Sequence, residues 1–271
     1  MRVVTFFKWV LLTSNGSFLF FIFVLQQLDL IMGRVFEKRK HKMFARFAKM
    51  AKTFTRIGKE IAMAAKQGGG DPDTNARLRI IIQNAKAVNM PKTNIDAAIQ
   101  RAINKDTKNY EEVVYEGYAA HGVAILIETA TDNTTRTVAN VRHCFNKGGG
   151  ALGKTGSLDF MFDRKGIFEV ELGQWNLEDL ELELIDFGLE EIDQDGEKVF
   201  ITVPFKEFGH MQKALEEKKI VVVSAENERI PNTFKEVTAE QAADVQKLLD
   251  LLEDDDDVQN VFHNMKGPDE E

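Results

Sequence analysis

The sequence predicts an α+β protein in which a three-helix domain precedes two α/β domains, one of them ferredoxin-like and inserted in the other. Three observations predict this fold. Apolar residues recur at helical spacing up to Tyr110 and alternate at strand spacing after it. Strands and helices between Gly166 and Ala225 follow the order βαββαβ of a ferredoxin-like unit. One further helix and one further strand come after that unit and have no place in it.

Charge is also divided along the chain. Residues 32–110 carry 18 Lys+Arg against 6 Asp+Glu, whereas residues 111–271 carry 15 against 36. The formal net charge of −8 therefore conceals a cationic domain on an acidic body. A cationic surface of this kind is typical of proteins that bind nucleic acids.

The first 31 residues form an apolar extension that we assign to none of these domains. Thr13 to Ser17 interrupts its apolar runs, so neither run reaches the roughly 20 residues of a membrane-spanning helix. No small-residue cleavage site follows. We interpret Met32 as the native start, with a signal peptide or a membrane anchor as the alternative.

The basic domain, residues 32–110, begins with an amphipathic helix predicted from Met43 to Lys66. Its apolar stripe contains Phe44, Phe47, Ala51, Phe54, Ile61 and Ala65. Its basic stripe contains Lys42, Arg46, Lys49, Lys52, Arg56 and Lys59. Only Glu37 and Glu60 oppose the 11 Lys+Arg between Gly33 and Lys66, so few intrahelical ion pairs can neutralise the stripe. The stripe therefore favours a phosphate backbone, with an anionic membrane surface and a simply solvated face as alternatives.

A basic arm precedes this helix, and two further helices follow it. The arm, Arg34 to Lys42, offers phosphate contacts from Arg34, Lys38, Arg39 and Lys40. Gly68 to Gly70 ends the first helix. We expect a second helix over Thr74 to Val88 and a third from Pro91, with Ile103 facing the core.

The acidic body begins with a domain made of two separate segments, residues 111–165 and 232–267. We expect strands at Val113 to Tyr118, Gly122 to Thr131 and Leu158 to Phe162, and a helix over Asn133 to Lys147. A capping box at Thr238 starts the late helix through Leu252, and a last strand covers Val258 to His263. The acidic run Glu253 to Asp257 is expected to end that helix and stay solvated.

Residues 166–231 form the predicted insertion. We expect strands at Gly166 to Glu171, Leu189 to Asp193, Lys198 to Val203 and Ile220 to Ala225, with helices at Leu177 to Phe187 and Lys206 to Lys218. Asp195-Gly196 marks the hairpin between the two central strands.

Gly148 to Thr155 matches the pattern of a phosphate-binding loop, G-x-x-x-x-G-K-[ST]. The context argues against nucleotide hydrolysis, because a helix precedes the loop and a strand follows it, the reverse of the required order. We interpret the loop as a flexible tip. Together with Arg136, Arg142, Lys147 and Lys154 it forms a second candidate phosphate contact.

We predict no enzymatic activity, no cofactor and no bound metal. No Ser-His-Asp, Cys-His or paired-carboxylate set with supporting context is present, and the five histidines have no ligand spacing. The single cysteine, Cys144, cannot form an internal disulfide, which fits a reducing cytoplasm. We also expect a monomer with no small-molecule substrate.

Several stretches resemble the YebC/PmpR family, which includes the mitochondrial translational activator of cytochrome oxidase subunit I. They are GGGDPD (68–73), NMPKTNI (89–95), YEGY (115–118), TDNTTRT (131–137), VRHCF (141–145), KGGGALGKTGS (147–157) and FDRKG (162–166). The resemblance covers Gly33 to about Lys266 and implies three domains, one inserted in another. It also implies a cytoplasmic, non-enzymatic regulator, generally described as a DNA-binding transcriptional regulator, with members that resemble ribosome-associated translation factors.

Two functions therefore stay open at the level of sequence. The chain regulates transcription by laying its basic helix and arm on duplex DNA, or it acts in translation by binding ribosomal or transfer RNA with the same surface. Lysine-rich faces bind phosphates of either kind and do not separate the two. A membrane-tethered protein, anchored by the residues before Met32, is the minor alternative.

Overall fold

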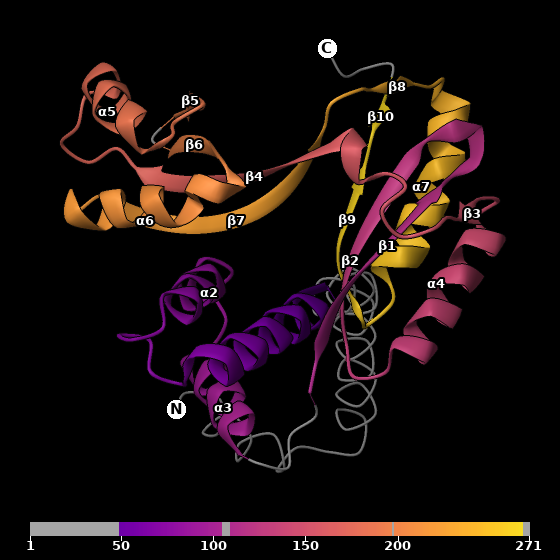
Figure 1. Cartoon of the computed structure of the whole chain (residues 1–271), viewed down its shortest axis with the longest axis horizontal. Helices are drawn as coiled ribbons and strands as arrows, with labels where there is room; N and C mark the ends of the chain where they lie inside the picture. The colour runs from indigo at the N-terminus through magenta and orange to yellow at the C-terminus, as the bar shows by residue number, and fades with distance from the viewer. Residues whose placement is uncertain (1–48, 105–108, 197, 268–271) are drawn as a thin grey trace, which may run out of the picture. The chain divides into compact units, whose positions relative to one another are not determined.

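The computed structural model describes residues 49–104, 109–196 and 198–267 (Figure 1). Contacts along the chain divide it into one unit of residues 1–52 and a second of residues 53–271. The fold described below is that of the second unit. The apolar extension, the basic arm and the first part of the predicted basic helix lie outside the described residues.

Three helices make up the first part of this unit. The first helix covers residues 49–68, of which 53–68 belong to this unit, and α2 (Ala76–Ala87) and α3 (Lys92–Ile103) follow. Their shared core contains Ile61, Leu78, Ile81, Ala85, Ile95 and Ile99. Asn75 caps α2 by accepting from the amide of Leu78, and its side-chain amide donates to the carbonyls of Ala64 and Gly69. The prediction that Ile103 faces the core is wrong, because its side chain is 55% exposed at the end of α3.

The first sheet contains strands from both ends of the acidic body. Its order is β3-β1-β2-β9, with β1 (Glu111–Tyr118), β2 (Ala124–Thr131), β3 (Ala151–Leu152) and β9 (Val258–His263). All neighbours are antiparallel, and β9 pairs with β2. Strand β9 thus returns from the end of the chain to the sheet that begins at residue 111, as the two-segment domain requires. The limits of that domain stay a prediction.

Two helices, α4 (Thr134–Lys147) and α7 (Ala239–Glu253), cover one face of this sheet (Figure 1). Their apolar sides meet the strands in one core, which contains Ile125, Ile127, Val141, Phe145, Val245, Leu248 and Leu252. The predicted capping box starts α7: Thr238 accepts from the amide of Gln241, whose side chain accepts from the amide of Thr238. A short parallel pair, β8 (Lys235–Glu236) with β10 (Met265–Lys266), closes the end of this part.

The second sheet is ferredoxin-like, as predicted. The chain order is β4 (Phe162–Glu171), α5 (Leu177–Leu184), β5 (Glu191–Asp195), β6 (Lys198–Pro204), α6 (Phe208–Glu217) and β7 (Val221–Pro231). The strands are arranged β5-β6-β4-β7 with antiparallel neighbours, which is the spatial order of that fold. α5 and α6 pack on this sheet through Leu180, Leu184, Met211 and Leu215.

The link between the sheets differs from the sequence prediction. Leu158 to Phe162 is not a strand: Asp159–Met161 forms a 3-10 turn, and β4 begins at Phe162. Large apolar residues at every second position from Leu158 to Phe162 suggested a strand with one apolar face. In the structure Leu158 is buried while Phe160 is 76% exposed, so these residues do not share a face. None of the helices that the structure describes is long and apolar enough to cross a bilayer.

Candidate nucleic-acid interface

The turn after α7 carries one carboxylate of the acidic run into the interior. α7 ends at Glu253, and the chain turns through the next three aspartates to Asp257. Only 7% of the Asp257 side chain is exposed. The prediction that the run from Glu253 to Asp257 stays solvated is therefore wrong at Asp257.

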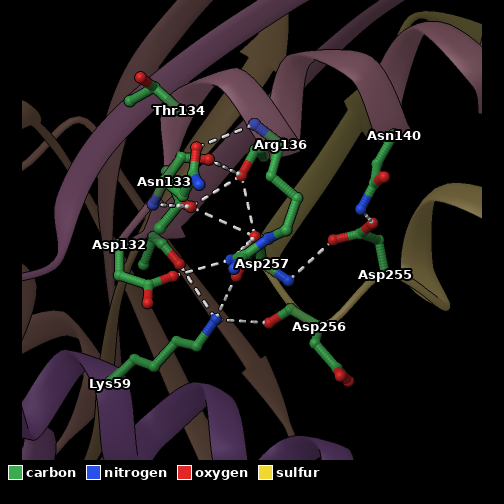
Figure 2. A network of polar contacts seen from close by, with 12 residues as sticks. Lys59, Asp132, Asn133, Thr134, Arg136, Asn140, Asp255, Asp256 and Asp257 are labelled. Carbon is green, nitrogen blue, oxygen red and sulfur yellow. Dashed lines mark hydrogen bonds and ion pairs between the residues drawn. The ribbon is translucent and has the colours of Figure 1, made fainter. Parts of the chain in front are cut away.

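Two cations and two hydroxyls surround the Asp257 carboxylate (Figure 2). Oδ1 accepts from the Lys59 ammonium at 2.9 Å, and Oδ2 accepts from the Arg136 guanidinium at 2.6 Å. The Thr137 and Thr131 hydroxyls donate to Oδ2 at 2.8 and 3.2 Å. We call these five residues the Asp257 network.

These contacts set the ionisation of Asp257. Burial by itself raises the pKa of a carboxyl group, but hydrogen bonds from Lys59, Arg136 and Thr137 outweigh it. The pKa of Asp257 therefore falls to about 2. The carboxylate is ionised at neutral pH and balances the two cations beside it.

Lys59 is the first predicted phosphate contact whose environment in the structure differs from the prediction. The helical pattern placed it on an exposed stripe, yet only 9% of the residue is exposed. Its ammonium donates to Asp257, to the carbonyl of Asp256 at 2.7 Å and to the carbonyl of Ala130 at 3.0 Å. All three donors of the ammonium are thereby used. Its placement on the exposed face is wrong, because Lys59 fastens the first helix to the first sheet.

Arg136 is likewise neutralised, although 45% of its side chain is exposed. It donates to Asp257 and, at 2.8 Å, to Asp132 one turn earlier. Hydrogen bonds with Asp257 and Asp132 raise the pKa of this guanidinium above its usual range. Asn133, the N-cap of α4, accepts from the Arg136 amide and fixes the backbone at the same place.

Three predicted contacts remain on the described part of the first helix. Lys49 is exposed, and Lys52 and Arg56 are partly buried. Arg56 donates to the carbonyl of Glu253 at 2.8 Å, where the negative end of α7 attracts a cation. The remaining predicted contacts, Arg34, Lys38, Arg39, Lys40, Lys42 and Arg46, lie outside the described residues.

A second buried carboxylate organises the glycine-rich loop. Glu116 on β1 is 2% exposed and accepts from the amides of Gly156 and Leu158 and from the Ser157 hydroxyl. The amide of Gly153 donates to the Glu116 carbonyl at 2.7 Å, and β3 pairs with β1 just before it. The loop is thus anchored to the first sheet along its length.

Close backbone approach explains two of the glycines. A Cβ atom at Gly150 would lie 2.5 Å from the carbonyl oxygen of Tyr118, and one at Gly148 would lie 2.7 Å from Cβ of Leu248. Both distances are shorter than van der Waals contact. Gly148 and Gly150 therefore serve packing against α7 and the end of β1.

Basic side chains around this loop are left exposed. Arg142 and Lys147 lie on α4, and Lys154 lies in the loop. The structure gives their side chains no hydrogen bond or ion pair with any residue that it describes. We call Arg142, Lys147 and Lys154 the loop cluster. It is the part of the predicted α4 and loop site that stays available to a phosphate.

The same geometry argues against a nucleotide-binding phosphate loop. α4 runs into Gly148, and the two-residue strand β3 and a turn follow, so no helix N-terminus receives a phosphate there. Within residues 49–104, 109–196 and 198–267, no group of three His, Cys, Asp or Glu is placed to hold a metal ion.

Sequence reasoning missed Asp257 and Glu116 as organising residues. Asp257 is the last of four consecutive aspartates, and that run is typical of a solvated segment. Glu116 occupies an inward position of β1, and a charged residue at such a position was the available signal.

Comparison with known proteins agrees with this architecture. The family model for the TACO1/YebC second and third domain matches residues 110–265. The family model for the TACO1/YebC protein N-terminal domain matches residues 34–105. The chain belongs to the TACO1/YebC family. This confirms the resemblance noted in the sequence.

Relatives in the family align over nearly their whole length. A protein of Cytophaga hutchinsonii is 60% identical over 86% of this chain and 98% of its own. One of Parabacteroides distasonis is 54% identical over 89% of this chain and 99% of its own. Both are named probable transcriptional regulatory proteins.

A solved structure shares the fold. The conserved hypothetical protein Aq1575 from Aquifex aeolicus aligns with a TM-score of 0.70 at 37% identity. The alignment covers 82% of this chain and 93% of that one.

Proposed function

We propose that this TACO1/YebC family member regulates gene expression by binding nucleic acid, with duplex DNA as the target and transcription as the process. The described part of the proposed binding surface is the loop cluster, and the arm and the basic stripe stay predicted contacts of their own. The names of its relatives support a regulator of transcription.

The loop cluster carries the proposal. Several of the acidic body's basic side chains are held by carboxylates, for example Lys198 by Glu169 and Arg229 by Glu128 and Asp159. Arg142, Lys147 and Lys154 have no such partner among the residues the structure describes. Phosphate oxygens would supply the missing anions, releasing counterions from the nucleic acid.

Lys59 and Arg136 take a different part in this function. Their charges are already balanced by Asp257 and Asp132, so they position the first helix and α4. We therefore remove both from the set of direct phosphate contacts. Removing Lys59 would act through the fold.

A second candidate is a translation factor that binds ribosomal or transfer RNA with the same surface. One observation favours this candidate. The loop cluster offers only positive charges, on α4 and on a loop, and the apolar side of α4 is packed on the first sheet. Such charges contact phosphates without reading bases, and they suit RNA as well as DNA.

Replacing Arg142, Lys147 and Lys154 together by Gln tests the proposal. We expect the affinity for a mixed-sequence DNA duplex to fall at least tenfold, and the slope of log K against log salt to become less steep by about 2.7, or about 0.9 for each of three phosphate contacts. Fluorescence anisotropy at several salt concentrations measures both, with a ribosomal RNA hairpin in parallel.

The matched control is Lys206→Gln, Lys213→Gln and Lys247→Gln, which removes the same charge from exposed lysines elsewhere. An equal loss in the control would show that net charge alone acts and would overturn the assigned surface. Tighter binding of RNA than of DNA in the wild type would overturn DNA as the target and favour the translation factor.

A further inference from the structure

A cleft of about 590 Å³ lies inside the second unit, where its helices meet both sheets. Its walls come from the first helix and α2, from β1, β2 and β9, and from β4 and β7. The volume lies within the range of small-molecule sites in proteins, about 300–1,000 Å³. Among the described residues, Arg56 is the one predicted nucleic-acid contact that lines this cleft.

Three carboxylates in the cleft lack a partner. Glu60, Glu226 and Glu228 line it, and none of them forms a hydrogen bond or an ion pair with the residues in the structure's described ranges. Other carboxylates of the same cleft are satisfied: Glu112 is held by Arg77 and Glu128 by Arg229. Of the first three, Glu60 and Glu228 are half-buried and Glu226 is exposed, so all three carboxylates are open to a ligand in the cleft.

These carboxylates also act on one another. Glu226 and Glu228 are two residues apart on β7, so their side chains leave the same face of the sheet. Burial, followed by the charge of Glu226, raises the pKa of Glu60 to about 7, with Arg77 opposing and Glu112 and Glu128 adding to the rise. A cation placed among them would relieve both the burial and the repulsion.

A buried amide provides an independent sign of a ligand. Gln259 on β9 lines the cleft and is 7% exposed, and neither its amide nitrogen nor its amide oxygen has a hydrogen-bond partner among the described residues. Buried side-chain amides are almost always hydrogen-bonded, because burying one unpaired costs about 1–3 kcal/mol. Gln259 thus carries an unpaired amide nitrogen and an unpaired amide oxygen in the wall of the cleft.

The other cations of the cleft are engaged elsewhere. The Arg164 guanidinium stacks on the Phe205 ring at 3.6 Å from its centre, and Arg56 donates to the Glu253 carbonyl. The carboxylates also do not converge on a point, since no three of them in the described ranges are placed to hold one metal ion. An occupant must therefore spread its positive charges over a length.

We propose that the cleft binds an extended organic cation of the di- or polyamine class. Its ammonium groups would donate to Glu60, Glu226 and Glu228, and the Gln259 amide would hold one further amine. The inference goes beyond the proposed function and is tested without nucleic acid.

Isothermal titration of the full chain with spermidine and with putrescine at low salt tests it. We expect saturable binding of one spermidine per chain, weakened at least tenfold in the double variant Glu60→Gln Glu226→Gln. The control, Asp179→Asn Glu181→Gln, removes the same charge from the exposed side of α5 and should bind like the wild type. Equal affinity in all three proteins, equal losses in both variants, or no saturation would overturn the proposal.

Two further measurements separate the cleft from general attraction to an acidic protein. Spermidine affinity should rise as the pH passes upward through 7, because Glu60 then ionises while the amines stay protonated, and Glu60→Gln should remove that rise. Gln259→Met should weaken binding at least threefold while leaving the thermal midpoint equal or higher. A flat pH profile in the wild type, or binding of a lysine-rich peptide but not of spermidine, would overturn the proposal.

Discussion

The Asp257 network lies at the start of α4, whereas Lys147 and Lys154 of the loop cluster lie at its end and in the loop beyond, and the two places treat their basic side chains in opposite ways. At the start of α4, Asp257 neutralises Lys59 and Arg136. At its end, Lys147 and Lys154 have no partner in the described part of the chain. Basic residues that look equivalent in a sequence thus divide into those that hold the fold together and those that have no partner in the described chain.

The difference arises from the kind of donor from which each buried carboxylate accepts hydrogen bonds. Asp257 accepts hydrogen bonds from a lysine and an arginine, and its negative charge neutralises them. Glu116 beneath the loop cluster accepts from the backbone amides of Gly156 and Leu158 and from the Ser157 hydroxyl. Because those donors are neutral, the loop is anchored without using the neighbouring lysines.

The largest expected effect comes from removing the carboxylate of the network. Asp257→Ala leaves the Lys59 ammonium buried without its anion, and loss of one partner of a buried pair costs about 3–5 kcal/mol. Urea unfolding followed by circular dichroism measures the loss. The control Asp256→Asn changes an exposed neighbour whose backbone carbonyl still accepts from Lys59.

The pH dependence sharpens the same test. The folded pKa of Asp257, about 2, lies below the unfolded value of 3.8, so its contribution is fully present above pH 4. That contribution, on the order of 2 kcal/mol, should be lost as the pH falls from 4 to 2. Asp257→Asn should flatten the curve in that window. Identical acid profiles in variant and wild type would show that the network does not stabilise the fold.

The next largest expected effect on stability concerns the glycine-rich loop. Glu116→Gln turns an acceptor of two amides into a group whose NH₂ must face one of them, so we expect a loss of roughly 1.5–3 kcal/mol. Urea unfolding measures it, with Glu111→Gln at the exposed start of β1 as the matched control. Nucleic-acid affinity should fall as well, because the loop that carries Lys154 loses its anchor. Unchanged stability would mean that the glycine packing alone holds the loop.

Much of the fold could be predicted because local signals and the global pattern agree. Thr238 and Gln241 begin α7 as a capping box, and Gly196, at φ +64°, ends β5 at the predicted hairpin. Ile103 was placed inward although it is exposed, and a strand was expected through Phe160, which is exposed in a turn. The spacing of apolar residues indicates which positions of a regular helix or strand share a face. It gives no such information where the helix ends or where the chain forms a turn.

The site was less predictable for a different reason. The helical pattern correctly groups Lys59 with Lys52 and Arg56, yet it carries no information about what packs on that stripe. The partner of Lys59 is 198 residues away, in a run that looks solvated. The cleft is equally hidden, because Glu60 and Gln259 come from opposite ends of the chain and only the folded arrangement brings them to one surface.

The smallest effect on stability, and the sharpest contrast, should come from a pair of equal substitutions. Lys147→Gln removes an exposed charge with no partner in the described chain, so the free energy of unfolding should change by no more than about 0.5 kcal/mol. The salt slope of DNA binding should nonetheless fall by about 0.9, one phosphate contact. Lys59→Gln should do the reverse, lowering stability while leaving the salt slope unchanged, because its ammonium never reaches the phosphates. If Lys59→Gln lowered the slope while Lys147→Gln left it intact, the roles assigned to the two ends of α4 would have to be exchanged.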